Sequence, residues 1–369
     1  MSRAKRQILP VFIPNLGCAH ECVFCDQRLI SGESDPISAD DVRNICNEWM
    51  KTANGGTGSG GKNSTFETSE KILKTAGKPP AEEGKASAPA EVAFYGGSFT
   101  ALPANFQNEL LEAVQPILKL NSQNSIRVST RPDCIDRQTV DRLKSFGVGT
   151  IEIGAQSMCD EVLALAKRGH TAGDTVKASG IIKDAGLALI LQMMTGLQGD
   201  SYDRSLYTAR CIIDLKPDGV RVYPTVVIRG TRLFNMWQTG QYREHSVEDA
   251  VGLCAEISAL FSEAGVPVIR MGLNPSNSLS SGDAVAGAYH PAFGELVYSR
   301  VYYNKAVSGL IGVEPDSNIV ITVAYGHTSK MSGNRRDNVR RLIEKHSLRS
   351  LKIVESDIVS GEIKIEITP

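Results

Sequence analysis

Three cysteines lie close together near the start of the chain, in the segment GCAHECVFCDQ, with the spacing Cys18-x3-Cys22-x2-Cys25. Three thiolates spaced in this way can bind three corners of a [4Fe–4S] cube, which leaves the fourth iron without a protein ligand and open to a small molecule. An aromatic residue, Phe24, directly precedes the last cysteine. The segment therefore predicts a metal centre formed by Cys18, Cys22 and Cys25, with one open iron.

Two other interpretations of the same segment remain open. His20 together with the three cysteines would supply the four ligands of a closed structural zinc site. However, Cys18 and His20 are only two residues apart, and no second ligand pair follows at zinc-finger spacing. The other interpretation is that the thiols are merely buried and bind no metal. Metal analysis separates these interpretations, because the iron–sulfur cluster predicts iron and inorganic sulfide, whereas the structural zinc site predicts stoichiometric zinc.

The bulk composition limits the functional classes. The 369 residues include 40 Lys and Arg against 41 Asp and Glu, so the net charge is −1 and no overall field favours nucleic acid or membrane binding. Any basic surface must be local. Apart from the clustered cysteines, the chain has five scattered ones, which is unlike a secreted disulfide scaffold. We therefore expect a reducing compartment and a cytoplasmic protein.

The start of the chain imitates a lipoprotein signal, since a basic segment and an apolar stretch precede Leu16-Gly17-Cys18. The apolar stretch is short and is interrupted by Pro10 and Pro14, which a secretory helix tolerates poorly. No other apolar run is long enough to cross a bilayer. We expect no membrane association.

Strand and helix signals alternate along most of the chain, which is typical of a parallel sheet with right-handed crossovers. Too few units are present for an eight-fold barrel, so the sequence predicts a partial (β/α)6 barrel whose loops at the carboxyl ends of the strands carry the chemistry. Strands are expected at 8–14, 91–95, 125–130, 150–154, 188–194, 219–225 and 267–272.

The composition also predicts domain boundaries. Residues 52–90 are rich in Gly, Ser, Ala, Pro and Lys and have almost no large apolar side chains, so we expect a flexible insertion there. The barrel should occupy 1–275, and 276–369 should form a small C-terminal α+β region. A basic helix is expected around 335–346. Its cations (Lys330, Arg335, Arg336, Arg340, Arg341 and Lys345) either meet RNA phosphates or form a solvated face, because Asp337 and Glu344 interleave with them.

Several motifs follow the cysteine loop. Four lie near the ends of expected strands: Tyr95-Gly96-Gly97-Ser98-Phe99-Thr100, Ser129-Thr130-Arg131-Pro132-Asp133, Gly154-Ala155-Gln156-Ser157 and Gln192-Met193-Met194-Thr195-Gly196-Leu197. A fifth, Lys167-Arg168-Gly169-His170-Thr171, lies in the segment that follows the third of these. Their order resembles the radical S-adenosylmethionine (SAM) superfamily, and within it the branch of the Elongator catalytic subunit and its shorter bacterial relatives. A fainter similarity connects the chain to the oxygen-independent coproporphyrinogen oxidases.

The resemblance implies SAM as a second cofactor beside the cluster, with a residue role for each motif. The glycine-rich turn would bind the methionyl amino group, Gln156 and Gln192 would bind ribose hydroxyls, and Arg168 would bind the carboxylate. The Elongator subunit has a carboxylate where this chain has Ser129. Arg131 and Asp133 are either part of the site or a structural ion pair. The cofactor-binding candidates are Gly96, Gly97, Ser98, Ser129, Gln156, Arg168 and Gln192.

The implied reaction is reductive cleavage of SAM to a 5′-deoxyadenosyl radical, with a flavodoxin- or ferredoxin-type electron donor and RNA, in particular tRNA, as the candidate substrate. Tyr223 and His290 are candidate catalytic residues at the open end of the barrel. No acetyl-CoA-binding turn is recognisable, so we expect no acetyl transfer. The alternatives are a porphyrinogen-type radical oxidoreductase and a non-catalytic RNA-binding protein with a structural metal.

Overall fold

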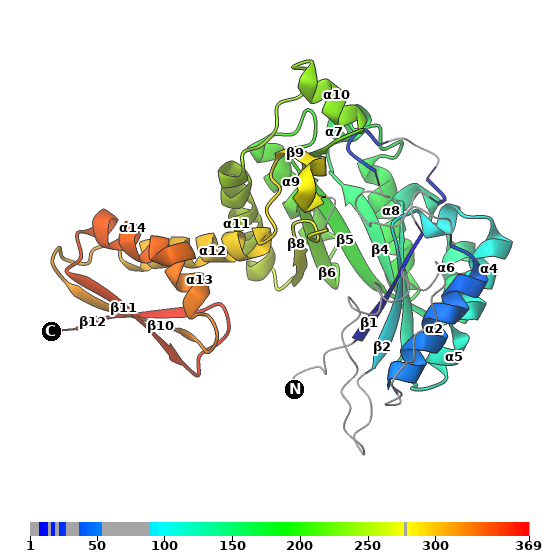
Figure 1. Ribbon diagram of the computed structural model, residues 1–369, viewed down its shortest axis with the longest axis horizontal. Helices are drawn as coiled ribbons and strands as arrows, with labels where there is room; N and C mark the ends of the chain where they lie inside the picture. The colour runs from blue at the N-terminus through cyan, green and yellow to red at the C-terminus, as the bar shows by residue number, and fades with distance from the viewer. Residues whose placement is uncertain are drawn as a thin grey trace.

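The computed structural model of the chain describes residues 7–13, 16–18, 22–26, 37–53, 89–276 and 279–368. Its largest element is a seven-stranded sheet in the order β1-β2-β3-β4-β5-β6-β8, with every neighbouring pair parallel. The sheet curls into a half-barrel (Figure 1), so the predicted partial barrel is confirmed. Its strands are β1 (Gln7–Phe12), β2 (Ala90–Tyr95), β3 (Ser125–Thr130), β4 (Val148–Gln156), β5 (Ala188–Thr195), β6 (Gly219–Pro224) and β8 (Val268–Met271).

Helices connect successive strands, and several begin at a capping side chain. The side chains of Asp136, Thr171, Ser201 and Ser246 each accept a hydrogen bond from a backbone N–H three residues later, which satisfies a free donor of the first turn. The helices of the barrel are α2 (Ala39–Ala53), α4 (Ala104–Ala113), α5 (Gln115–Leu118), α6 (Arg137–Ser145), α7 (Asp160–Leu165), α8 (Ala172–Asp184), α9 (Tyr202–Asp214), α10 (Arg232–Gln238) and α11 (Val247–Glu263).

The two faces of the sheet differ in chemistry because side chains alternate along each strand. On β3, Ile126 and Val128 are fully buried in the main hydrophobic core of the barrel. Arg127 lies between them and takes part in ion pairs with the neighbouring strands β2 and β4. The inner face of the half-barrel is therefore lined by polar and charged groups, and we call this space the hollow.

The C-terminal region is the predicted α+β unit. In its sheet, the central strand β10 (Asn318–Ala324) pairs with β11 (Ser350–Ser356) in parallel and with β12 (Ile363–Thr368) in antiparallel. Helices α13 (Thr328–Ser332) and α14 (Asp337–His346) lie beside it (Figure 1). The long helix α12 (Phe293–Gly309) connects this unit to the barrel, since its first half packs in the barrel core and its second half in the C-terminal core.

Two further features bear on the sequence expectations. A small antiparallel ribbon of β7 (Val226–Ile228) and β9 (Ala284–Gly287) was not predicted. Most of the predicted insertion, residues 54–88, lies outside the described residues, and its predicted ends overlap α2 and β2. Within the described part of the chain, every helix is too short or too polar to span a membrane.

Candidate functional site

The cysteine loop follows β1 and is held against the end of β2 by backbone contacts. The amide of Ile13 donates to the carbonyl of Tyr95 at 2.7 Å, and the amide of Ser98 donates to the carbonyl of Leu16 at 2.9 Å. Glycines make this approach possible: a Cβ at Gly17 would lie 2.2 Å from the Ser98 oxygen, and a Cβ at Gly97 would lie 2.4 Å from the Leu16 oxygen. The glycine turn after β2 therefore positions the loop that carries Cys18.

The second half of the loop is anchored by Val23 and Phe24. The amide of Val23 donates to the carbonyl of Ala166 at 3.2 Å, and its carbonyl accepts from the amide of Leu233 at 2.7 Å. Val23 and Phe24 are buried in an apolar cluster, on which Cys22 and Cys25 pack. The aromatic residue in front of the last cysteine thus serves as an apolar anchor for the loop.

Arg168 connects the cysteine loop to the sheet. Its Nη1 donates to the Sγ of Cys22 at 3.1 Å, and its Nη2 donates to the carbonyl of Gly154, near the end of β4, at 2.8 Å. The residue is only 7% exposed, so it is not a solvated surface charge. Its Nε is buried and has no hydrogen-bond partner among the described residues. A buried guanidinium with an unused donor suits an anionic ligand.

Gln156 and Gln192 form an amide pair on neighbouring strands. The Nε2 of Gln192 donates to the Oε1 of Gln156 at 3.3 Å. Gln156 has φ +64° and sits at an irregularity in the pairing of β4 with β5. A Cβ at Gly154 would lie 2.8 Å from the Nε2 of Gln156 and 3.3 Å from the Nη2 of Arg168. Gly154 therefore makes room for both side chains. The sequence alone predicts no role for Gly154, although a glycine inside a strand often marks a close approach.

His170 follows Arg168 by two residues and is 6% exposed. Its Nε2 is 3.2 Å from the carbonyl oxygen of Ala155, and its Nδ1 has no partner among the described residues. Burial lowers the pKa of His170 to about 4, and the positive charge of Arg168 acts in the same direction. The imidazole is therefore neutral near pH 7.

The thiols share their surroundings with two arginines. The pKa of Cys18 is raised, first by burial and then by the neighbouring Cys22, while Arg168 and Arg131 act in the opposite direction. Cations of this kind favour thiolates, the form that binds metal. Within the described residues, no three His, Cys, Asp or Glu side chains are grouped closely enough to hold a metal ion. His20, the fourth ligand of the zinc interpretation, lies outside those residues.

The hollow below this site contains a network of buried charged and phenolic groups centred on Arg221 of β6. The Nε of Arg221 lies 2.9 Å from the Oε1 of Glu152, its Nη2 donates to the phenol of Tyr95 at 3.0 Å, and its Nη1 lies 3.3 Å from the phenol of Tyr223. Burial raises the pKa of Tyr223. Tyr223 is therefore a protonated phenol inside the hollow.

The network continues to β2 and β3. The Nη2 of Arg127 lies 2.7 Å from the Oε2 of Glu91, and its Nη1 lies 3.5 Å from the Oε2 of Glu152. Thr150 donates to Glu91 at 2.9 Å. Two glutamates and two arginines thus balance each other across β2, β3, β4 and β6. The sequence does not predict this network, because its members are far apart in the chain.

The remaining candidates occupy varied environments. The Oγ of Ser98 is buried 3.0 Å from the Oγ1 of Thr130. The Oγ of Ser129 is buried without a partner among the described residues. Arg131 and Asp133 form an ion pair at 3.0 Å, as one of the two interpretations expected. His290 is exposed, and its Nδ1 accepts a hydrogen bond from the amide of Ala292 at 3.0 Å.

The chain matches two known protein families. Residues 12–211 match the Radical SAM superfamily, and residues 217–303 match the Radical_SAM C-terminal domain. The first match includes the cysteine loop, Arg168 and the amide pair, and the second includes β6 and most of α12.

Individual relatives agree with these families. The chain is 28% identical over 228 residues to the tRNA uridine(34) acetyltransferase of Methanocaldococcus jannaschii, covering 56% of this chain and 41% of that protein. It is 31% identical over 190 residues to Elongator complex protein 3 of Saccharomyces cerevisiae, covering 46% and 34%. The chain therefore spans well under half the length of these relatives.

A solved structure shows the same fold. The archaeal Methanocaldococcus infernus Elp3 with an N-terminal deletion superimposes with a TM-score of 0.54 at 22% identity, over 87% of this chain and 71% of that one.

Proposed function

Because the chain belongs to the radical SAM superfamily, we propose that it cleaves SAM reductively at a [4Fe–4S] cluster bound by Cys18, Cys22 and Cys25. The observation that carries this proposal is the position of Arg168, whose guanidinium bridges the Cys22 sulfur and the end of β4. Three thiols on one loop, with the buried guanidinium of Arg168 against Cys22 and the Gln156–Gln192 amide pair on β4 and β5, fit the donor set of such a site.

When bound, the cluster and SAM supply an electron and a 5′-deoxyadenosyl radical that abstracts hydrogen from a C–H bond. The residues of the chain bind and orient these groups. In this proposal, Arg168 binds the carboxylate of SAM through charge-assisted hydrogen bonds, and the amides of Gln156 and Gln192 bind ribose hydroxyls. Gly96, Gly97 and Ser98 offer backbone groups to the methionyl amino group.

Inside the hollow, Tyr223 is the candidate for contact with the substrate. Its pKa is raised by burial, so the phenol can donate a hydrogen bond or a hydrogen atom near neutral pH. Ser129, with a buried hydroxyl that has no partner among the described residues, is a second polar group there. His290 stays a weaker candidate because its Nδ1 is already engaged by a backbone amide.

We infer that the substrate is an RNA, in particular a tRNA. The support comes from the relatives, one of which is a tRNA uridine(34) acetyltransferase. An electron donor of the flavodoxin or ferredoxin type would reduce the cluster. These assignments concern the radical step alone, since the chain covers 41% of that relative.

The test is anaerobic reconstitution with iron and sulfide, followed by dithionite and SAM and assay of 5′-deoxyadenosine. Wild type should form it, and Cys22→Ala should lose both the iron–sulfur absorbance and the product, because each corner of the cluster needs its thiolate. Cys211→Ala is the matched control, since Cys211 lies on α9, outside the loop. Full cleavage by Cys22→Ala, or stoichiometric zinc in place of iron, would overturn the proposal.

A further inference from the structure

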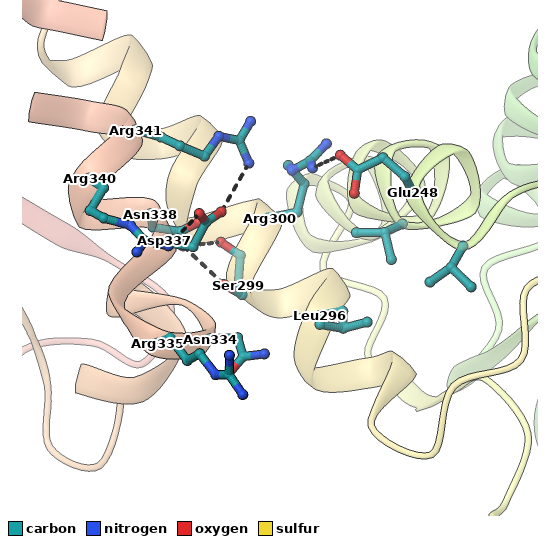
Figure 2. Close-up of a pocket in the computed structure, with 12 residues that line it drawn as sticks. Glu248, Leu296, Ser299, Arg300, Asn334, Arg335, Asp337, Asn338, Arg340 and Arg341 are labelled. Atoms are coloured by element: carbon teal, nitrogen blue, oxygen red, sulfur yellow. Dashed lines mark hydrogen bonds and ion pairs between the residues drawn. The ribbon is translucent and has the colours of Figure 1, made fainter. Parts of the chain in front are cut away.

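A surface groove of about 330 Å³ lies where the C-terminal unit meets the barrel. Figure 2 shows its three sides: Glu248 comes from α11 of the barrel, Leu296, Ser299 and Arg300 come from α12, and Arg340 and Arg341 come from α14. The groove is thus formed by the part of the barrel that matches the Radical_SAM C-terminal domain together with the C-terminal unit, and its lining includes no residue of the cysteine loop.

The groove has an excess of positive charge. Four arginines line it (Arg300, Arg335, Arg340 and Arg341), against two carboxylates, Glu248 and Asp337. Arg300 pairs with Glu248. Asp337 is shared, since it lies 3.2 Å from Arg340 and 3.8 Å from Arg341. Arg335 has no carboxylate partner within the described part of the chain, so the groove offers uncompensated guanidinium groups to an anion.

The turn that presents Arg335 is held in an unfavourable backbone conformation. Arg335 and Arg336 are consecutive non-glycine residues with φ +49° and +62°. They follow Gly333, where a Cβ would lie 3.0 Å from the backbone nitrogen of Asn338. Such conformations cost free energy and persist only where the surroundings impose them.

Asn338 provides that restraint. It is 5% exposed, and its Nδ2 donates to the Oγ of Ser299 at 2.9 Å and to the carbonyls of Ser299 and Met331 at 3.1 Å. The start of α14 is therefore tied to α12. Arg341 is fixed as well, with its guanidinium 4.3 Å from the ring centre of Tyr303. The backbone that carries Arg335 and the side chain of Arg341 are thus preorganised in the groove.

We propose that this groove binds the phosphate backbone of the RNA substrate, at a distance from the reacting nucleoside. The proposal rests on the proposed function, which supplies RNA as the substrate. Rigid, planar guanidinium groups match phosphate oxygens in pairs, which favours arginine over lysine in such sites.

The position of the groove favours RNA over an acidic electron donor. In Figure 1, α14 lies in the C-terminal unit at one end of the molecule and α12 runs from that unit to α11 of the barrel, whereas the cysteine loop is held at Val23 near α7 and α10, on another side of the barrel. A donor protein seated in the groove would be far from the cluster that it must reduce. A long polyanion such as tRNA can contact the groove and still place one nucleoside at the hollow.

The test measures binding of bulk tRNA by filter retention over a range of salt concentrations. The double variant Arg335→Ala/Arg340→Ala should bind about ten- to hundredfold more weakly at 0.1 M salt, because each lost phosphate contact removes about one unit from the salt slope. Arg349→Ala/Lys352→Ala is the matched control, since it removes two exposed cations from the same unit outside the groove. This control should bind like wild type.

Equal tRNA affinity of wild type and the Arg335→Ala/Arg340→Ala variant would overturn the proposal, as would equal weakening in the control. A variant that keeps tRNA binding but loses cleavage with flavodoxin, and not with dithionite, would show a donor site instead. Formation of 5′-deoxyadenosine with dithionite alone tests the proposed function separately. The groove variant should retain it in full, because no groove residue lies among the cofactor-binding candidates.

Discussion

The guanidinium of Arg221 on β6 donates a hydrogen bond of 3.0 Å to the phenol of Tyr95 on β2 and lies 5.3 Å from the centre of its ring. Three strands separate β2 from β6 in the sheet, so this contact crosses the hollow instead of following the sheet. Tyr95 directly precedes the glycine turn, and Arg221 is two residues before Tyr223. The contact therefore connects the two sides of the half-barrel below the candidate cofactor site.

Removal of Arg221 should destabilise the fold strongly. Arg221→Met leaves the carboxylate of Glu152, which is buried, with Arg127 at 3.5 Å as its remaining cation. Breaking a buried pair by removing one partner costs about 3–5 kcal/mol. Tyr95→Phe should cost about 1 kcal/mol, and the double variant should cost less than the sum, because both changes remove the same contact.

Urea denaturation of the cluster-free proteins measures these free energies of unfolding. Arg137→Met is the control, since Arg137 pairs with Asp141 on the surface, where both side chains are more than half exposed. This variant should stay within about 1 kcal/mol of wild type. If Arg221→Met were no less stable than Arg137→Met, the network would not support the fold.

Arg168→Ala should weaken SAM binding by about one to two decades. A hydrogen bond to a charged group contributes about 1.5–3 kcal/mol, and 1.4 kcal/mol corresponds to a tenfold change in affinity. Iron content should stay unchanged, because Arg168 is not an iron ligand in the proposed site. Anaerobic calorimetry with SAM measures the affinity.

The control for Arg168 is Arg204→Ala. Arg204 pairs with Glu161 on α7 at the surface, so its removal changes the charge by the same amount outside the site. The Arg204→Ala protein should bind SAM with the same affinity as the wild-type protein. Identical affinities for Arg168→Ala and Arg204→Ala would remove Arg168 from the cofactor site.

His170 should make stability depend on pH. Its pKa is about 4 in the folded protein, against 6.5 for an ordinary histidine. Between pH 6.5 and pH 4, His170 therefore binds a proton in the unfolded chain but not in the folded protein. The free energy of unfolding falls as the pH falls through this range, by up to about 1.4 kcal/mol per pH unit. Above pH 6.5 this contribution is fully present.

His170→Gln should lose less stability than wild type between pH 7 and pH 5, since a neutral amide replaces the titrating ring. Urea unfolding midpoints of the cluster-free proteins at pH 7, 6 and 5 provide the comparison. His290→Gln, a change at an exposed histidine, should follow the wild-type profile. A His170→Gln profile parallel to wild type would show that another group titrates.

The segment between α2 and β2 should be dispensable for folding. Its composition predicts a flexible connection, and each doubling of a loop's length costs only about 0.6 kcal/mol. Replacing residues 57–85 with a short Gly/Ser bridge keeps both flanking elements and should leave the unfolding free energy within about 1 kcal/mol of wild type. Circular dichroism and iron content report on the outcome. An insoluble or unfolded product would show that the segment packs against the barrel.

Much of the barrel could be predicted from the sequence because buried parallel strands are continuous apolar runs, and each run is followed by its helix. The Arg131–Asp133 pair could also be foreseen, because its partners are two residues apart. The Arg221–Tyr95 contact could not, since its partners are 126 residues apart and meet only when the sheet curls. The ribbon of β7 and β9 cannot be predicted from the sequence, because strands of three and four residues are too short to show a periodic pattern.

Local backbone geometry explains the other omissions. The sequence does not predict the role of Gly154, because the need for a small residue there comes from Gln156 and Arg168, whose side chains lie against it only in the folded structure. The left-handed turn at Arg335 and Arg336 carries no signature in the chain, since neither residue type favours positive φ. Both positions depend on neighbours that the folded structure supplies.

Helix α12 belongs to two hydrophobic cores at once: Phe293 and Val297 pack in the barrel, while Tyr302 and Ala306 pack in the C-terminal unit. Cutting the chain near residue 276 would uncover Val297 and Phe293 on one fragment and their contact surface on the other. Each fragment would then expose an apolar patch that promotes aggregation. We expect the barrel and the C-terminal unit to unfold in a single calorimetric transition. Proteolytic cleavage that leaves the protein folded should occur outside α12.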